Sequence, residues 1–299
     1  MVMPLVVVGV DGSEESLRAV EWAALEAERH RSPLRIVSAP AMPPRMRARY
    51  SSPRTVADVL REVSRLVLRA AVTRAEEISP CLLIDTVLLS GPPALAVTGS
   101  GCGALMLVVG SQGTSGLAAA LIGSVSRHAA MHASCPVVVV REETTAVHRE
   151  VAVGIRDARD ITGALAFGFE EAALRGAGLV AVHACHRFPS ARGGPARTSD
   201  AAGHPVGTGQ SPAEASRNLA AAVSGWQERY PAVTVRCDVV HGRPARVLAR
   251  YSAQEDLLVI GMHHGRGTGQ LLNSVERALL THLRGPVAVI PENWVPIAA

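Results

Sequence analysis

The sequence has few aromatic and few charged residues. Aromatic side chains make up 3% of its 299 residues and charged ones 19%, against 48% apolar residues. This composition excludes disordered, collagen-like and fibrous proteins and places the chain among globular proteins. At this length, two domains of about 150 residues each are expected.

No charge of one sign dominates the chain. Thirty basic residues against 26 acidic ones give a formal charge of +4, and the basic residues are scattered rather than gathered in one stripe. Proteins that bind nucleic acid concentrate basic residues on one face. We therefore expect no nucleic-acid partner.

Paired cysteine motifs are also missing. The five cysteines include no C-x-x-C pair. Their number and spacing predict neither a disulfide framework nor a zinc site, and they suit a reducing cytoplasm. His263 and His264, with His241 before them, lack a carboxylate at ligand spacing, so we predict no metal site there.

The sequence lacks a long, unbroken hydrophobic run. The apolar run 5–10 has no basic segment before it and acidic residues after it, which is unlike a signal peptide. The most apolar region, 87–110, is interrupted by glycines and prolines and is not a clean membrane span. We expect no membrane partner and a cytoplasmic location.

What the sequence does contain is an internal repeat. Several motifs recur at a shift of 145 to 151 residues. The matched pairs include Val6-Val-Val-Gly-Val with Val151-Ala-Val-Gly-Ile, Gly91-Pro-Pro-Ala with Gly242-Arg-Pro-Ala, and Cys135-Pro-Val with Gly285-Pro-Val. We infer a duplicated domain and predict domains at 1–145 and 146–299.

Within each half, short β-branched runs alternate with segments of helical period, a pattern typical of βαβ units. Strands are predicted at 5–10, 34–39, 82–89, 104–109, 136–141, 151–155, 179–184, 233–240, 257–261 and 286–290. Helices are predicted at 14–30, 56–78, 93–100, 124–133, 161–176, 213–229, 244–253 and 274–284. We therefore expect an α/β fold made of two tandem, doubly wound, five-stranded parallel-sheet domains of Rossmann-like type.

A glycine signature follows the fourth predicted strand. It reads Gly110-Ser-Gln-Gly113, then nine residues, then Gly123-Ser124. Glycines let the backbone approach a ligand closely, and a Gly-Ser pair opening a helix directs amides and a hydroxyl at one spot. The spacing predicts a phosphate-binding loop that is neither a Walker A loop nor a G-x-G-x-x-G fingerprint. Ser124 and Asp11 also have a structural interpretation, since each can cap a helix.

Together with Val8-Gly-Val-Asp11-Gly-Ser at the end of the first strand, this signature resembles that of the universal stress protein family, in its ATP-binding type. The resemblance covers nearly all of both halves. It implies an adenine nucleotide alpha hydrolase-like version of the fold and ATP as the cofactor, with Mg²⁺ as an optional companion. It also implies a regulatory role in the stress response, homodimers, and a regulated partner protein that the sequence does not identify.

The resemblance also implies roles for individual positions. In the family, the aspartate closing the first strand holds the adenine-ribose end of the nucleotide, main chain after the second strand contacts adenine, and the glycine signature holds the phosphates. Carried onto this sequence, the binding residues are Gly9, Val10, Asp11, Ala39, Val109, Gly110, Gly113, Gly123, Ser124, Val125 and Ser126.

The second half departs from this pattern. Ile155-Arg156-Asp157 stands where the first half has Val10-Asp11-Gly12, and Gly261-Met-His-His264 with Asn273-Ser274 stands in place of the glycine signature. An arginine thus replaces the carboxylate or shifts it by one residue, and His264 brings a ring where backbone should meet phosphate. We expect weaker or absent nucleotide binding there.

Three functions are compatible with the sequence: an ATP-dependent regulator, a slow ATPase or phosphotransferase, and a scaffold that has lost its nucleotide. Phosphoryl transfer needs a metal-holding carboxylate, a charge-stabilising cation and a positioned nucleophile. Around the signature the candidates are Ser111, Gln112, Ser115 and Arg127, so we predict no catalytic residue and no dedicated enzyme. We expect the two halves to pair through their fifth strands, as domains of this family do, and whole chains to pair into homodimers.

Overall fold

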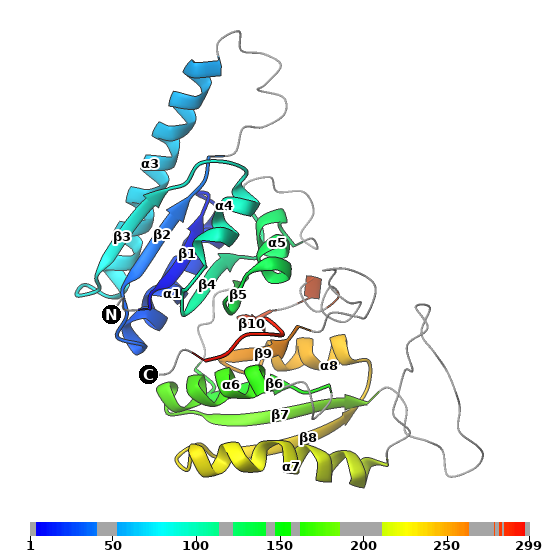
Figure 1. The fold of residues 1–299 in the computed structure, drawn as a ribbon. Coiled ribbons are helices and arrows are strands. Elements are labelled where there is room, and N and C mark those ends of the chain that lie inside the picture. Colours follow the sequence, from blue (N-terminus) through cyan, green and yellow to red (C-terminus); the bar gives the residue numbers. More distant parts are fainter. Residues whose placement is uncertain are drawn as a thin grey trace.

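The computed structural model describes residues 4–40, 53–113, 122–141, 147–156, 162–185, 211–262, 278, 281–282 and 284–296. Strands and helices alternate along both halves of the chain (Figure 1). The helix predicted at 274–284 lies mostly outside the described residues.

The first half has the predicted elements, with ends that differ from the prediction by at most three residues. Its strands are β1 (Val6–Val10), β2 (Leu34–Ser38), β3 (Ile84–Leu88), β4 (Met106–Gly110) and β5 (Val137–Val140). Its helices are α1 (Glu14–Arg29), α3 (Pro53–Ile78), α4 (Pro93–Ser100) and α5 (Ser124–His132).

The second half repeats the arrangement. Its strands are β6 (Glu150–Gly154), β7 (Gly178–Cys185), β8 (Val235–His241), β9 (Leu257–Gly261) and β10 (Val287–Ile290). Its helices are α6 (Thr162–Arg175), α7 (Pro212–Arg229) and α8 (Pro244–Tyr251).

Local capping fixes where two of the long helices begin. Ser13 caps α1 by accepting the Ser16 amide at 3.2 Å, and glutamates fill the first turn. Ser211 and Glu214 form a reciprocal capping box at the start of α7, with Pro212 as the first helical residue. These side chains satisfy amides that the helix leaves without an internal acceptor.

All ten strands form one sheet, in the order β3-β2-β1-β4-β5-β10-β9-β6-β7-β8 (Figure 1). Within each half the paired strands are parallel. Both halves have the strand order 3-2-1-4-5, counted from their own first strand. The predicted fold of two tandem five-stranded domains is confirmed, and the two sheets are continuous with each other.

The joint between the halves is an antiparallel pair of their last strands. Val137 lies opposite Val289, Val138 opposite Ala288, and Val139 opposite Val287. Val138 and Ala288 are equivalent positions of the repeat, so a pseudo-two-fold axis passes between them. The prediction that the halves pair through their fifth strands is confirmed.

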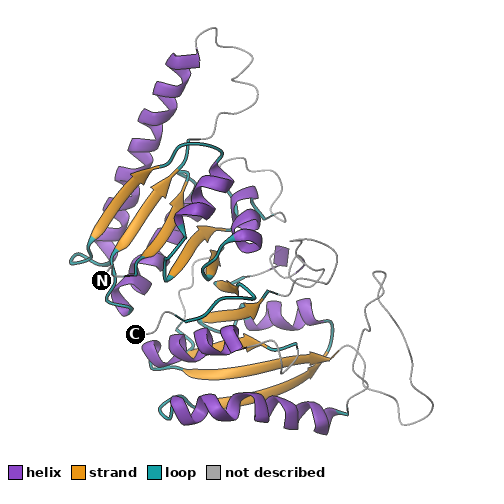
Figure 2. Cartoon of the chain, in the orientation of Figure 1, coloured by secondary structure: helices purple, strands orange, loops and turns teal. Residues whose placement is uncertain are grey.

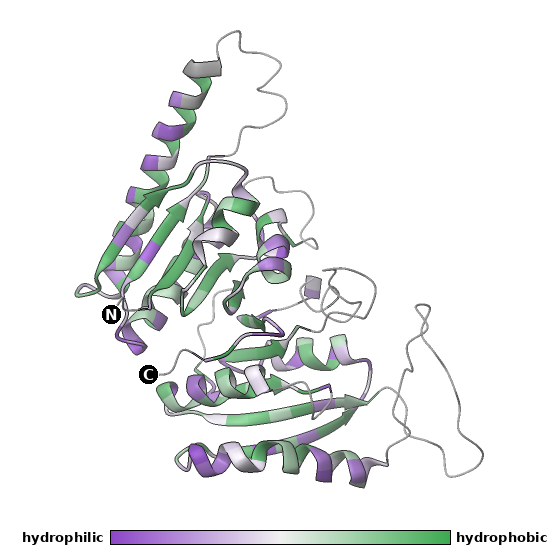
Figure 3. Ribbon diagram, in the orientation of Figure 1, coloured by the Kyte–Doolittle hydropathy of each residue, from purple (hydrophilic) through white to green (hydrophobic). Residues whose placement is uncertain are grey.

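Helices cover both faces of the sheet (Figure 2). Strand side chains alternate between faces: Val6 and Val8 belong to the cluster that contains residues of α1, α3, α6 and α7, whereas Val7 belongs to the cluster that contains residues of α4, α5 and α8. The strands are apolar along most of their length, and polar residues lie on the helices (Figure 3). This pattern is typical of parallel strands buried on both sides.

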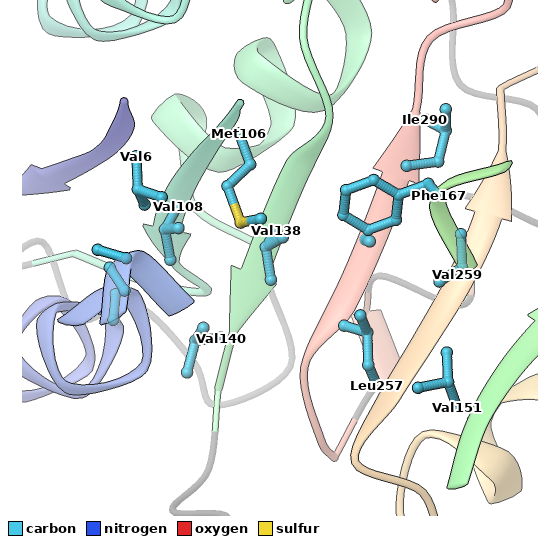
Figure 4. Packing of buried hydrophobic residues seen from close by; sticks show 14 of the residues in the cluster. Val6, Met106, Val108, Val138, Val140, Val151, Phe167, Leu257, Val259 and Ile290 are labelled. Carbon is cyan, nitrogen blue, oxygen red and sulfur yellow. The ribbon is translucent and has the colours of Figure 1, made fainter. Parts of the chain in front are cut away.

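One hydrophobic core runs through the joint. On the α1 and α6 face, Met106 and Val138 of the first half lie in the same cluster as Phe167 and Ile290 of the second (Figure 4). All four are at most 3% exposed. The halves therefore share buried surface as well as backbone hydrogen bonds.

The helices of the described ranges include none that is both long and apolar enough to cross a membrane.

Candidate functional site

The predicted site residues gather at the carboxyl end of β1, where the strand order reverses. Helix α1 leads from β1 to β2 on one side, whereas β4 lies on the other side of β1. In open α/β sheets, ligands bind at such a point. The ends of β1 and β4 and the starts of α1 and α5 all meet there (Figure 1).

Asp11 leaves β1 and turns the chain into α1. Its Oδ1 accepts the backbone N–H of Ser13 at 3.0 Å and the Ser13 hydroxyl at 2.6 Å. Ser13, not Asp11, is the N-cap residue of α1. The capping interpretation of Asp11 is therefore wrong, and Asp11 instead holds the residue that does cap the helix.

Gly110 is a glycine because α1 packs against it. A Cβ at this position would lie 2.8 Å from the carbonyl carbon and oxygen of Glu15 and 3.1 Å from the amide nitrogen of Ser16. These are backbone atoms that cannot move without moving the helix. The first glycine of the signature thus lets α1 approach β4 closely.

Gly113 and Gly123 differ in what surrounds them. A Cβ at Gly113 would meet the Asp11 carboxylate, so this glycine brings the loop against that side chain. Among the described residues, a Cβ at Gly123 would find nothing nearer than the Ser111 carbonyl oxygen at 3.5 Å. The backbone at Gly123, with φ −63° and ψ 157°, is one that any residue adopts. Neither this conformation nor packing against the described residues requires a glycine at 123.

The start of α5 is tied to the end of β4 and has no side-chain cap. The Gly123 amide donates to the Ser111 carbonyl at 2.8 Å, and the Ser126 hydroxyl donates to the Gly110 carbonyl at 2.5 Å. Gly123 is the N-cap residue and supplies no side chain, and Ser124 is the first helical residue, so the capping interpretation of Ser124 is wrong. The amides of the first helical turn have no intrahelical acceptor, and the helix dipole favours an anion there.

Ser111, which the sequence offers as a candidate catalytic group but not as a binding residue, contributes a polar atom here. The residue is 2% exposed, and its Oγ has no hydrogen-bond partner in the described part of the chain. Its amide donates to the Val140 carbonyl at 2.7 Å, which holds the residue in place. A buried hydroxyl without a partner is costly, so its position beside α5 fits a bound polar group. The signal in the sequence was only its place between two signature glycines.

The remaining predicted residues lie around this position. Val10 and Val109 are buried in the core, so only their main chain is available to a ligand. Ala39 directly follows β2, and Val10 is paired with the residue before it. A Cβ at Gly9 would meet the Val97 side chain at 2.8 Å, so packing explains this glycine. On α5, Ser124 is exposed and Val125 is partly buried.

In the second half, much of the equivalent region lies outside the described residues. This holds for Asp157, His263, His264, Asn273 and Ser274. Where the first half has an exposed Asp11 after β1, the described part of the second half has an exposed Arg156 after β6. In addition, a ring nitrogen of His183 lies 2.9 Å from the Ile155 carbonyl oxygen, so a side chain stands at the end of β6. The expected asymmetry stays a prediction.

The first-half site is suited to binding an anionic ligand that carries hydroxyl groups. It combines the amides of a helix N-terminus, the Ser111 hydroxyl, and the Asp11 carboxylate, which lies against Gly113. The chain contains no lysine, and the arginine on the first turn of α5, Arg127, is exposed. The described site residues thus offer binding groups rather than a set of catalytic ones.

Both halves of the chain match the family model described as the universal stress protein family, over residues 4–141 and 148–291. A universal stress protein of Mycobacterium tuberculosis (strain H37Rv) is 36% identical over 305 residues, which cover 96% of this chain and 97% of the relative. A second one from the same strain is 32% identical over 307 residues, covering 96% of each.

The fold is also similar to a solved structure. The crystal structure of a universal stress protein from Archaeoglobus fulgidus superposes with a TM-score of 0.71 at 15% identity, covering 96% of both chains. At this identity, the likeness concerns the fold.

Proposed function

Because the chain belongs to the universal stress protein family, with one such domain in each half, we propose that its first half binds ATP. The bound nucleotide regulates contacts with a partner protein in the stress response. The observation that carries this proposal is the open position at Gly123. Neither the backbone conformation nor the described neighbours require a glycine there, whereas a phosphate group seated on the α5 amides would.

Each group has a role in this proposal. The amides of Ser124, Val125 and Ser126 and the hydroxyl of Ser111 bind phosphate oxygens. The Asp11 carboxylate accepts a hydrogen bond from a ribose hydroxyl, and the main chain at Ala39 and Val109 borders the base. Where Mg²⁺ accompanies ATP, phosphate oxygens and water supply most of its ligands.

The proposal favours a regulator over an ATP-consuming enzyme. Enzymes of phosphoryl transfer place a lysine or arginine on the transferred phosphate. This chain has no lysine, and Arg127 is exposed. The scaffold alternative fits the second half better, since Arg156 stands where the first half has Asp11.

We also propose a cytoplasmic location and pairing of whole chains. The five cysteines are all free, which suits a reducing compartment. On α3, Val59, Val63 and Leu66 are each at least half exposed, and an apolar helix face of this kind suits contact with a second copy. Sedimentation at several protein concentrations tests this: a monomer at all of them would contradict the pairing.

The direct test of ATP binding is to denature the purified protein and to identify and count the released nucleotide. We expect about one ATP per chain, because one site is intact and such sites are few per protein. No released nucleotide, together with no binding of added ATP, would leave the scaffold as the function.

Replacing Asp11 tests the ribose-binding role. We expect Asp11→Ala to weaken ATP binding about tenfold or more, because a hydrogen bond to a charged group contributes about 1.5–3 kcal/mol. Titration calorimetry on nucleotide-free protein measures this. Asp58→Ala on α3, which removes an exposed carboxylate of the same half, is the control. Equal affinities for the two variants would contradict the role.

Replacing Ser111 by alanine should affect the free and the bound protein differently. In the free protein the hydroxyl is buried without a described partner, so its removal is expected to be neutral or slightly stabilising. ATP binding should weaken by about fivefold, as for one lost hydrogen bond of about 1 kcal/mol. Thermal unfolding with and without ATP measures both effects. A destabilised free protein with unchanged ATP affinity would assign the hydroxyl a structural role only.

A further inference from the structure

A buried ionic cluster joins the two halves away from the nucleotide site. It consists of Glu26 on α1, His30 directly after the end of α1, and Glu171 and Arg175 on α6. Glu171 follows Glu26 by 145 residues, and Arg175 follows His30 by 145. This is the shift that relates β1 to β6, so the cluster pairs equivalent positions across the pseudo-two-fold axis.

The cluster is almost fully removed from solvent. The side chains of Glu26 and Glu171 are 0% exposed, that of Arg175 is 5% exposed and that of His30 is 8% exposed. An Nη2 atom of Arg175 lies 2.8 Å from Glu26 Oε1, and its Nη1 contacts the Glu171 carboxylate. His30 Nε2 lies 2.9 Å from Glu171 Oε1. Arg175 thus bridges two carboxylates that come from different halves.

The repeat explains why one of the cations is titratable. A symmetric cluster would have an arginine at both equivalent positions. The first half instead has His30 where the second has Arg175. Among these equivalent positions, the two buried carboxylates therefore face one permanent cation, Arg175, and one imidazole, whose charge depends on pH. A second permanent cation, the partly exposed Arg29, contacts Glu26 from the side of solvent. Burying a carboxylate without full compensation is expensive, so the cluster is expected to hold a proton.

The contacts of Glu26 leave the negative charge of its carboxylate only partly compensated. Its Oε2 has no hydrogen-bond partner among the described residues. Arg29 contacts the other oxygen, but its side chain is 38% exposed. Beside His30 lies a cavity of about 20 Å³, lined also by Phe167, Glu170 and Trp294, which is large enough for about one water molecule.

The pKa directions follow from these contacts. Burial raises the pKa of Glu26 to about 7 against the opposing charge of Arg175. Burial alone would lower the pKa of His30, but its hydrogen bond to Glu171 and the charge of that carboxylate raise it above its usual value. Burial opposes ionisation of Glu171 as well, yet Arg175 and His30 lower its pKa.

A metal ion is not the occupant that this geometry favours. Ligand atoms of Glu26, His30 and Glu171 lie within 4.8 Å of one another. The guanidinium of Arg175 already lies on both carboxylates, however, and a divalent cation would have to displace it. A proton needs no such displacement.

We propose that Glu26, His30, Glu171 and Arg175 form a proton-binding latch between the two halves, which holds them together when protonated and weakens as pH rises through neutrality. The other ionisable groups that face it are Arg29 on α1, Glu170 on α6 and, next to Glu170, Arg229 on α7. Burial raises the pKa of Glu170 too, so it acts in the same direction.

The sign of the effect is set by Glu26 and His30. A group whose pKa is raised by folding stabilises the folded state at low pH, and this contribution is lost as pH rises through the folded pKa. The pKa of Glu171 is lowered by folding, so Glu171 stabilises the folded state above its unfolded pKa and loses this stabilisation only in acid. The contribution of Glu26 is therefore lost as pH rises from 4.5 to about 7, and His30 adds to the loss above pH 6.5.

The test compares the full-length protein with Glu26→Gln, which keeps the shape of the side chain but releases no proton. For each proton that is released when the chain unfolds, the equilibrium constant for unfolding rises about tenfold per pH unit. We expect the unfolding midpoint of the unmodified chain to fall by about 5 °C between pH 6 and pH 8, and that of the variant to fall by less, because Glu26 no longer contributes while Glu255 and His30 still do. An equal fall in both would overturn the latch.

Glu255→Gln is the matched control. Burial raises the pKa of Glu255 to about 7 as well, but this carboxyl group belongs to a different cluster, with Glu150 and Arg236. The Glu255→Gln variant should also show a smaller fall of the unfolding midpoint with pH. A second measurement is therefore needed to separate the two sites.

The titration of His30 followed by NMR provides that measurement, with the His30→Gln variant identifying its signal. In the unmodified chain we expect a midpoint above the usual value of about 6.5 for histidine. Glu26→Gln should lower this midpoint, because a negative charge has been removed, whereas Glu255→Gln should leave it unchanged. A midpoint at or below the usual value in the unmodified chain would overturn the proposal without any variant.

Discussion

The Gly123→Asp variant should keep its fold and lose its nucleotide. A Cβ at 123 meets no atom of the described residues nearer than 3.5 Å, and the backbone there suits any residue. Aspartate is also a good N-cap residue, so α5 should form as well as before. Its carboxylate would accept the amides that we assign to phosphate and repel the phosphate charge, a cost of several kcal/mol. We expect at least about a hundredfold loss of ATP affinity.

Counting released nucleotide per chain and titrating ATP into nucleotide-free protein measure this loss. Gly123→Asn is the matched control, because asparagine caps a helix about as well but carries no charge. We expect it to lose about tenfold in affinity, well short of the aspartate variant. If the two variants bind ATP as the unmodified chain does, the α5 amides do not hold the phosphates.

Gly110→Ala should have the largest effect on folding among the signature glycines. Its Cβ would lie 2.8 Å from backbone atoms of Glu15, so α1 would have to move away from β4. Overpacking of this kind costs about 1–3 kcal/mol, and the rigid backbone neighbour places this site at the upper end. Thermal unfolding of the nucleotide-free protein should show a midpoint lower by about 5–10 °C.

Gly99→Ala provides the contrast within the same domain. Gly99 lies in helix α4, and a Cβ there would meet no atom within 4 Å. Replacing a helical glycine by alanine stabilises by about 0.4–1 kcal/mol when there is space. We therefore expect a slightly higher midpoint for this variant. A Gly110→Ala variant as stable as the unmodified chain would mean that α1 adjusts without cost.

The sequence predicted the fold well because its signals are local. Runs such as Val6–Val10 and Val137–Val140 are entirely apolar and short, as buried parallel strands are. The start of α3 is the largest difference: the prediction began it at Val56, where the apolar pattern begins, whereas the helix begins at Pro53. Proline is favoured in the first helical turn, and this signal was overlooked.

The binding roles of the candidate site residues stay predictions, but the structure differs from the sequence analysis in which residues cap the helices and in the burial of Ser111. Asp11 was considered as a helix cap because its place after a strand suits one, but Ser13 is two residues nearer to α1 and takes that position. The importance of Ser111 depends on its being buried without a partner. No pattern in the chain reports that, because burial arises only when β4, β5 and α5 come together.

The ionic latch could not be read from either helix alone. On α1, Glu26 lies among buried alanines, and on α6, Glu171 lies beside buried apolar residues. Each is a charged residue on an apolar face, which is unexplained until the two helices meet. Their common spacing of 145 residues was visible in the sequence, and it is the one signal that connects them.

The antiparallel pairing of β5 with β10 has a consequence for how this protein can diverge. Two separate chains that pair along an edge come apart on dilution, but halves on one chain see each other at a fixed effective concentration. The second half covers the β5 edge of the first whether or not it carries a ligand of its own. The second half can therefore lose its nucleotide-binding residues during evolution without losing its place beside β5. One copy of the duplicated domain can then serve as a permanent structural partner, and the other can keep the proposed nucleotide-sensing role.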